Sequence, residues 1–309
     1  MAVRLASTRD LARSEWLRIR SRGIGGSEIA AIAGVSPWDT PLSVYLRKIG
    51  ELPEKDETEA MRWGRILEPV VAEEYKRRHP DRRVERVNAV LQHPEVPYFL
   101  ANVDRRVFGD ERGPGVLEVK TSSAWMAGRW REDCPDWVTC QVQWYLGVLG
   151  YSWATVAVLI GGQDYREIDI ERDDEIIGYL QEIGHRFWRE HVEKRVPPAV
   201  EANDNDTVTA LYPTDNGQEI DITPLAQSVL QEYDEAKQAE DEARKRREQA
   251  EARIKELMGE YATAWVGGRR ITWRTVTTSR FDTKAFREAH PDLYKEFTTP
   301  SSYRRFVVS

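Results

Sequence analysis

The sequence contains little of several features on which whole protein classes depend. Cys134 and Cys140 are its only cysteines among 309 residues. Two thiols exclude a disulfide scaffold, and they also exclude an iron–sulfur cluster or zinc site built from four thiolates. No apolar run approaches the roughly 20 residues that a membrane-spanning helix needs, and the first residues lack the apolar stretch of a secretory signal. We therefore expect a cytoplasmic protein with no membrane partner.

The 45 lysines and arginines are outnumbered by 52 acidic residues, but the charge is unevenly distributed. The formal net charge is −7, and residues 201–262 hold 16 acidic and 7 basic residues, a net charge of −9. Subtracting −9 from −7 leaves +2 for the rest of the chain. Basic clusters lie between Arg13 and Arg22 and between Lys76 and Arg86. Each cluster fits contact with phosphates and a solvated helix face about equally well.

Apolar spacing and turn-forming residues predict an α/β protein. Helices are predicted at 9–21, 27–34, 41–50, 57–79, 135–150 and 173–195, and strands at 84–91, 98–108, 116–121, 152–161 and 165–170. Ser27 and Thr40 are expected N-caps. The turn formers between Gly109 and Gly115 make 98–121 a predicted β-hairpin. Helices around a mixed sheet form an α/β sandwich.

The C-terminal third differs in character from the predicted sandwich at 1–198. Residues 199–222 are polar and rich in Asn and Asp, which predicts a linker. Residues 223–262 predict a long polar helix or helical arm, and 263–309 predict a small α+β module. Glu240 and Arg247 occupy d positions of the helix's heptads, which disfavours a self-associating seam.

Two acids and a lysine in the predicted hairpin carry the strongest chemical signal. Glu118 and Lys120 are two residues apart on a strand, so they share a face, while Val119 points into the core. If the hairpin pairs as predicted, Asp104 lies near Glu118. Converging carboxylates suit Mg²⁺, and an adjacent ammonium can orient water and stabilise negative charge.

An ordinary interpretation competes with this one. A lysine often pairs with a carboxylate across the strands of a solvated sheet. However, Asp104 follows the apolar run from Tyr98 to Val103, and Glu118 follows Val116 and Leu117. A charge in such surroundings is costly unless it is paired or bound to a metal, which favours the catalytic interpretation.

Five motifs stand in the order found in a known nuclease family. They are Arg20 to Ala31, Gly34 to Trp38, Gly64 to Glu68, Asp104 followed by Glu118-Val119-Lys120, and Gln141 to Tyr145. Over about residues 10–195 the sequence resembles the YqaJ and lambda-exonuclease group of PD-(D/E)XK nucleases. The resemblance implies a restriction-endonuclease-like core, in which helices flank a mixed central β-sheet, followed here by the long helix and the small C-terminal extension.

The resemblance also implies a role for each motif residue. Asp104 and Glu118 would be side-chain ligands of Mg²⁺, for which Mn²⁺ is expected to substitute, and the Val119 backbone carbonyl would complete the inner shell. Lys120 would be the catalytic lysine, and Gln141 would position the lysine or the attacking water. Glu68 would support a second metal or its waters, although a helix-surface glutamate is the plainer interpretation.

Two residues of the opening motif are implied to hold the 5′-phosphate of a DNA end. Ser27 begins a predicted helix after two glycines, where backbone N–H groups are open to an anion, and Arg20 offers a two-pronged guanidinium. Ser27 also fits a plain N-cap. One departure concerns the family's tyrosine on the helix that carries the glutamine, because Val138 occupies that position here.

The function implied by the resemblance is a 5′→3′ exonuclease that degrades double-stranded DNA from its ends and leaves 3′ single strands for recombination. Its implied partners are DNA ends and a single-strand annealing protein. The resemblance also implies a ring-shaped homo-oligomer. If the chain is phage-derived, its implied location is the cytoplasm of the bacterial host cell. Two alternatives remain open: a related PD-(D/E)XK endonuclease, and a catalytically inactive module that binds DNA ends.

Overall fold

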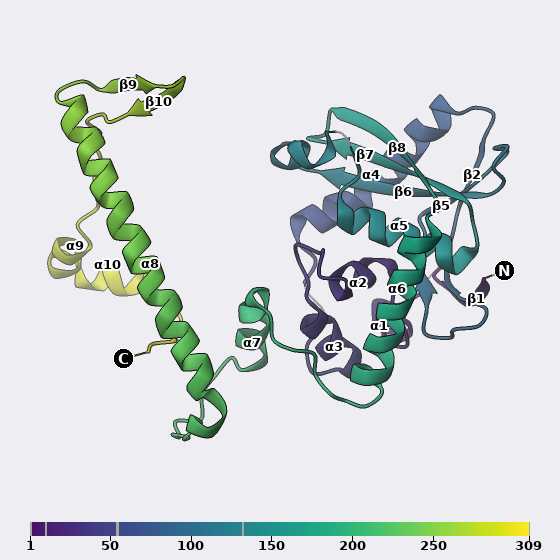
Figure 1. Ribbon diagram of the computed structural model, residues 1–309, viewed down its shortest axis with the longest axis horizontal. Helices are drawn as coiled ribbons and strands as arrows, with labels where there is room; N and C mark the ends of the chain where they lie inside the picture. The colour runs from purple at the N-terminus through teal and green to yellow at the C-terminus, as the bar shows by residue number, and fades with distance from the viewer. Residues whose placement is uncertain (1, 10, 54–55, 132, 309) are drawn as a thin grey trace. The chain divides into compact units, whose positions relative to one another are not determined.

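The structure is a computed structural model that describes residues 2–9, 11–53, 56–131 and 133–308. It comprises two units, Met1–Pro213 and Thr214–Ser309 (Figure 1). Each unit is described by itself. In the part of the chain that is described, no helix is long and apolar enough to cross a membrane.

A five-stranded mixed sheet organises the first unit. Its order is β2-β5-β6-β7-β8, in which β6 and β7 run parallel and the other neighbours run antiparallel. The strands are β2 (Arg83–Arg86), β5 (Arg105–Phe108), β6 (Gly115–Ser122), β7 (Trp153–Ile160) and β8 (Asp164–Glu171). The predicted hairpins β5–β6 and β7–β8 are both present. Strand β6, which bears Glu118 and Lys120, is the central strand in this order.

Alternating residues of the central strands build a separate core on each face of the sheet. Val116, Val156 and Val158 contribute to the larger core, which includes residues of α2 (Gly26–Ile32), α3 (Pro41–Ile49), α5 (Asp136–Leu149) and α6 (Asp174–Arg186). Leu117 and Val119 pack on the other face with buried residues of α4 (Glu59–Arg78). The predicted α/β architecture, a central mixed sheet with helices on both faces, is confirmed (Figure 1).

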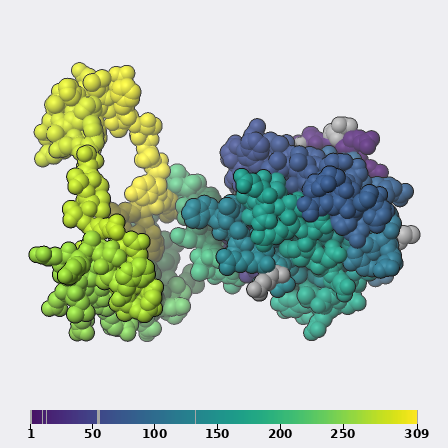
Figure 2. All heavy atoms as spheres, turned by 90° about the horizontal axis from the view of Figure 1, so that it is seen from above, coloured from purple at the N-terminus to yellow at the C-terminus, as the bar shows by residue number. Residues whose placement is uncertain are grey.

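Two predicted strands are each divided between two sheets. The stretch 84–91 separates into β2 and β3 (Ala89–Gln92), and 98–108 separates into β4 (Leu100–Ala101) and β5. A second sheet has the order β1-β3-β4, and its strand β1 (Val3–Ser7) lies at the surface of the first unit, in the purple part of the chain in Figure 2. The predicted continuous strands are wrong because the extended structure is interrupted at 87–88 in the first stretch and at 102–104 in the second. The second interruption leaves Asp104 at the start of β5.

The helix starts show one cap as predicted and one that is not. Thr40 caps α3 by accepting a hydrogen bond from the Ser43 backbone N–H at 3.1 Å. Ser27 does not cap α2, because the N-cap is Gly25, and the Glu28 carboxylate accepts the Gly25 N–H at 2.8 Å. Glu28, three residues after the cap, thus satisfies the backbone N–H of the cap residue, which is the glutamate's half of a capping box.

Helix α4 buries a narrower face than its sequence predicts. Val71, Ala72 and Tyr75 are buried, whereas Met61 and Val70 are more than half exposed. Only part of the apolar residues of this helix therefore face the core. Other helical pieces of the first unit are α1 (Arg13–Arg20), the 3-10 segment η1 (Ala124–Trp130) and the π-helical segment η2 (Phe187–Val192).

The stretch expected as a linker, 199–222, is partly folded onto the first unit. It contains the short 3-10 helix η3 (Ala202–Asp204) and α7 (Asn205–Leu211). Asp204 is fully buried and accepts hydrogen bonds from the Thr40 hydroxyl and from the Glu201 backbone N–H. The division between the units falls after Pro213 because this buried carboxylate holds the preceding segment to the start of α3.

The second unit begins with the predicted long helix, α8 (Thr223–Met258), which is exposed along most of its length. A hairpin of β9 (Thr263–Val266) and β10 (Arg269–Thr272) follows, and then α9 (Thr283–Ala289) and α10 (Pro291–Glu296). After α8 the described residues of the second unit thus form a hairpin and two short helices, which is a small α+β arrangement.

Candidate active site

The lysine and one of the predicted acids meet on the face of β6. The Lys120 ammonium donates to Glu118 Oε1 at 2.6 Å and to Gln141 Oε1, on α5, at 3.0 Å. The Glu118 side chain is 4 % exposed and that of Lys120 26 %. Although burial lowers the pKa of Lys120, the carboxylates of Glu118 and Asp104 raise it above its ordinary value. The amine is therefore a fixed positive charge at neutral pH.

Helix α5 contributes an amide and a phenol to the same site. Gln141 Nε2 donates to Glu118 Oε1 at 2.7 Å and to the Tyr145 hydroxyl at 2.9 Å. Gln141 and Tyr145 are one helical turn apart, so they project from the same side of α5. Tyr145 supplies an aromatic hydroxyl on the helix where Val138 replaces the family's tyrosine. Val138 itself is buried in the core.

Asp104 lies where β5 begins and is held by the strand opposite. Its Oδ2 accepts the Val119 backbone N–H at 2.9 Å. Burial raises the pKa of Asp104 well above its usual range, and the nearby carboxylates of Glu118 and Glu68 raise it further. Two acids in mutual repulsion are stabilised when a cation lies between them.

One carboxylate oxygen of this cluster accepts no hydrogen bond from the described residues. Glu118 Oε2 is buried and has no hydrogen-bond partner among the described residues. Leaving such a group unpaired costs about 1–3 kcal/mol, and more when it is charged. An orphaned carboxylate oxygen beside a second carboxylate is a donor set that suits a hard divalent cation. The residues present therefore fit the predicted Mg²⁺.

The third of the predicted acids is engaged elsewhere. Glu68, on α4, pairs with the buried Arg105 guanidinium at 2.6 Å, and the same nitrogen donates to the Asp104 carbonyl at 2.8 Å. In the described part of the chain, no group of three or more His, Cys, Asp or Glu side chains is arranged to hold a metal. Asp104 and Glu118 would thus be the two side-chain oxygen donors of a bound cation, and Arg105 links Glu68 to the backbone of Asp104.

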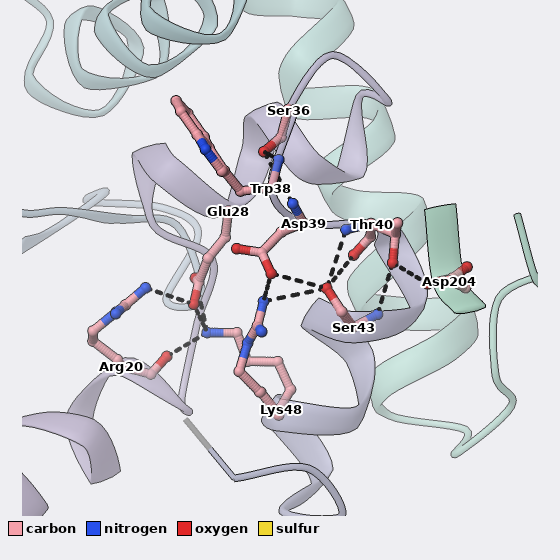
Figure 3. Close-up of polar contacts among 10 residues, drawn as sticks. Arg20, Glu28, Ser36, Trp38, Asp39, Thr40, Ser43, Lys48 and Asp204 are labelled. Atoms are coloured by element: carbon pink, nitrogen blue, oxygen red, sulfur yellow. Dashed lines mark hydrogen bonds and ion pairs between the residues drawn. The ribbon is translucent and has the colours of Figure 1, made fainter. Parts of the chain in front are cut away.

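Arg20 is held at the edge of the site by a buried ion cluster, drawn in Figure 3. Its guanidinium donates to Glu28 Oε1 at 2.9 Å and lies 4.8 Å from the Trp16 ring centroid. Lys48, on α3, donates to both Glu28 oxygens at 2.8 Å and to the Arg20 carbonyl at 2.7 Å. Lys48 and Arg20 lower the pKa of Glu28, although its burial acts in the opposite direction.

A pocket of about 220 Å³ joins the two groups of residues. It is lined on one side by Arg20, Gly26 and Ser27, and on the other by Asp104, Glu118, Gln141 and Tyr145. Gly26 permits this proximity, because an added Cβ would come within 2.5 Å of the Tyr145 ring. One cavity is therefore lined by the predicted phosphate-binding residues and by Asp104, Glu118 and Gln141. Lys120 does not line it and reaches its wall through hydrogen bonds to Glu118 and Gln141.

Sequence reasoning missed four residues that shape the site: Glu28, Lys48, Arg105 and Tyr145. Glu28 is three residues after Gly25, which is the capping-box spacing, and that signal was available. Lys48 and Arg105 gave no such signal, because each acts through a partner at least 20 residues away.

Comparison with known proteins agrees with the motif order. The family model of the YqaJ-like viral recombinase domain matches residues 15–152. The uncharacterized protein YqaJ of Bacillus subtilis (strain 168) is 35% identical over 311 residues, which cover 98% of this chain and 96% of that protein. The chain belongs to the YqaJ family. The resemblance predicted from the motifs is confirmed, and the matched residues of this YqaJ-family chain include Arg20, Glu118 and Gln141.

Solved structures resemble the YqaJ-family chain more distantly. The alkaline exonuclease LHK-Exo from Laribacter hongkongensis is 20% identical, with 59% of this chain and 93% of that chain covered and a TM-score of 0.48. The structure of LHK-Exo in complex with dAMP is 21% identical, with 63% of this chain and 98% of that chain covered and a TM-score of 0.49. A phage related exonuclease from Haemophilus somnus 129PT is 10% identical, with 56% and 96% covered and a TM-score of 0.42. These are similarities of fold alone.

Proposed function

We propose that this YqaJ-family protein is a Mg²⁺-dependent exonuclease that degrades double-stranded DNA in the 5′→3′ direction and leaves 3′ single strands for recombination. The observation that carries the proposal is the convergence of Lys120, Glu118 and Gln141 around a buried carboxylate oxygen without a partner, next to Asp104. Family membership in the viral recombinase group supports DNA as the substrate.

The chain's own residues account for binding and orientation. Asp104 and Glu118 would hold Mg²⁺, with the Val119 carbonyl as the third donor. When bound, Mg²⁺ polarises a phosphodiester oxygen and lowers the pKa of a bound water. The Lys120 ammonium provides a charge for the developing negative oxygen, and Gln141 fixes that ammonium by accepting from it at 3.0 Å.

Directionality follows from the other side of the pocket. The Arg20 side chain lines the cavity, and its contacts with Glu28 and with the Trp16 ring set the orientation of its guanidinium. Arginine forks bind phosphate oxygens in pairs, and Ser27 lies in the first turn of α2, where backbone N–H groups favour anions. A 5′-phosphate held there would place the next phosphodiester towards Lys120.

The experiment is cleavage of a duplex labelled at one 5′ or one 3′ end, with and without Mg²⁺. We expect label release from 5′-phosphorylated ends only when Mg²⁺ is present. Lys120→Ala should slow cleavage at least about 10²-fold, the usual contribution of a positioned catalytic group, while duplex binding is retained. Lys76→Ala, a paired lysine on the exposed side of α4, is the matched control and should cleave like the parent.

Three results would contradict parts of the proposal. Nicking of covalently closed circles would assign an endonuclease. Binding without cleavage in Mg²⁺ or Mn²⁺ would assign an inactive end-binding module. Undiminished cleavage by Lys120→Ala would remove the lysine from the chemistry.

A further inference from the structure

A second pocket in the first unit is lined by an unusual number of arginines. It has a volume of about 480 Å³ and lies among residues of β1, β2, β3 and β5. Its arginines are Arg4, Arg9, Arg86 and Arg106. One carboxylate, that of Glu85, also lines it. Four positive charges and one negative charge give this arginine pocket a net charge of +3.

The single acid does not neutralise these arginines. The Glu85 carboxylate is bound by the Arg83 guanidinium at 3.0 Å, outside the lining. Within the described ranges, none of the four arginines forms an ion pair with a carboxylate. Many other arginines of this unit do, as Arg105 and Arg112 illustrate. Like charges that converge without counter-charges repel one another, so an anion in this pocket would relieve the repulsion.

Arg106 supplies a second and independent observation. Its Nε is buried and has no hydrogen-bond partner among the described residues. Its guanidinium carbon lies 5.9 Å from the ring centroid of Tyr151, which limits its freedom. A buried N–H without an acceptor costs about 1–3 kcal/mol. The missing acceptor and the excess positive charge therefore occur at the same place.

We propose that the arginine pocket binds phosphate groups of a nucleic-acid backbone. Guanidinium forks match pairs of phosphate oxygens, and a net charge of +3 exceeds what one phosphodiester neutralises, so a stretch of backbone fits better than a single anion. The inference rests on the proposed function, because the ligand is the DNA on which the active site would act.

This pocket shares strand β3 with the candidate active site, and β5 of the pocket begins next to Asp104. The Val87 backbone N–H donates to the Asp104 carbonyl at 3.3 Å. On β3, Val90 lines the active-site pocket, whereas its neighbours Ala89 and Leu91 line the arginine pocket. Backbone phosphates bound here would anchor DNA on the strands that hold Asp104. Such interactions raise affinity without reading sequence.

The test measures binding of the full chain to a short fluorescein-labelled duplex by anisotropy, in EDTA, over a range of salt concentrations. The double variant Arg4→Ala/Arg106→Ala should bind about tenfold or more weakly, and the slope of log affinity against log salt should fall by ~0.9 for each phosphate that the variant no longer neutralises. Arg186→Ala/Lys194→Ala removes two exposed charges outside the pocket and should keep the parent slope. Thermal melts confirm folding, and Arg4→Glu, which leaves Arg106 in place, gives a second variant at an exposed position.

The outcomes separate this inference from the proposed function. Parent affinity and slope in both pocket variants would overturn the inference. So would calorimetric binding of inorganic phosphate that disappears in the variants while duplex binding is unchanged, because the pocket would then serve free phosphate. Duplex binding through the pocket without any cleavage in Mg²⁺ would support the inference and refute the proposed function. Mg²⁺-dependent cleavage by the parent, together with a salt slope that the pocket variants leave unaltered, would support the proposed function and refute the inference.

Discussion

Replacement of Lys48 by methionine tests whether the buried ion cluster stabilises the first unit. The Lys48 side chain is 2 % exposed, and its hydrogen bonds to described residues include two to the Glu28 carboxylate and one to the Arg20 carbonyl. Lys48→Met keeps an unbranched chain of similar length but leaves Glu28, whose side chain is 9 % exposed, with Arg20 as its remaining cation.

The magnitude follows from this geometry. Removal of one partner of a buried pair costs about 3–5 kcal/mol. Because Arg20 still contacts Glu28 at 2.9 Å, we expect the lower end, about 3 kcal/mol. For a unit of roughly 200 residues this corresponds to a fall in Tm of about 6–12 °C. Lys76→Met, in an exposed pair on α4, should change the unfolding free energy by less than about 0.5 kcal/mol.

Tryptophan fluorescence is the appropriate probe, because all 11 tryptophans except Trp265 and Trp273 lie in the first unit. Urea and thermal unfolding of Lys48→Met, Glu28→Gln and the double variant complete a double-mutant cycle. The double variant should recover part of the stability, since it no longer buries an unpaired carboxylate. A Tm of Lys48→Met within about 2 °C of the parent would refute the reasoning.

The pH dependence of the same comparison has a definite sign. The folded state lowers the pKa of Glu28 below its ordinary value of 4.5. A depressed carboxyl pKa contributes stability above the unfolded-state pKa, and this contribution is lost as the pH falls through the folded-state pKa. The difference in unfolding free energy between parent and Lys48→Met should therefore be full at neutral pH and shrink below pH 4.5.

Three further predictions concern the site and its support. Arg20→Lys should reduce the preference for 5′-phosphorylated over hydroxyl duplex ends by about tenfold in competition cleavage, because one ammonium cannot replace a two-pronged contact; an equal preference would move the phosphate site elsewhere. Tyr145→Phe leaves a Gln141 N–H without its acceptor, so turnover should fall about tenfold with duplex affinity kept, and parent turnover would contradict this. Asp204→Ala removes the buried acceptor of Thr40, which should destabilise the first unit by about 2 kcal/mol and speed proteolysis within 201–211; an unchanged digestion pattern would show that the segment is held by other interactions.

Local patterns in the sequence predicted most of the central sheet and the helices around it. The hairpin β7–β8, the Thr40 cap and α5 each depend on residues within one element or its turn, so their signals are local. The division of 98–108 between two sheets was not predictable in the same way. The run from Tyr98 to Val103 is apolar throughout, and only the pairing of β4 with β3 decides that it leaves the central sheet.

The candidate site shows the same limit. The spacing of Glu118 and Lys120 predicted their common face, and the structure joins them at 2.6 Å. The engagement of Glu68 by Arg105 was not predictable, because α4 approaches β5 only in the folded chain. The burial of Lys48 beside Glu28 likewise depends on how α3 packs, which no periodicity in either segment reports.

The close approach of Gly26 to the Tyr145 ring has a consequence for the products of the proposed reaction. The absent side chain lets α2 approach α5 closely, so the groups proposed to hold a terminal phosphate lie a short, fixed number of elements away from those proposed to cut the chain. The spacing between these two groups would then set the length of each released fragment, and that length should be the same whatever the base sequence.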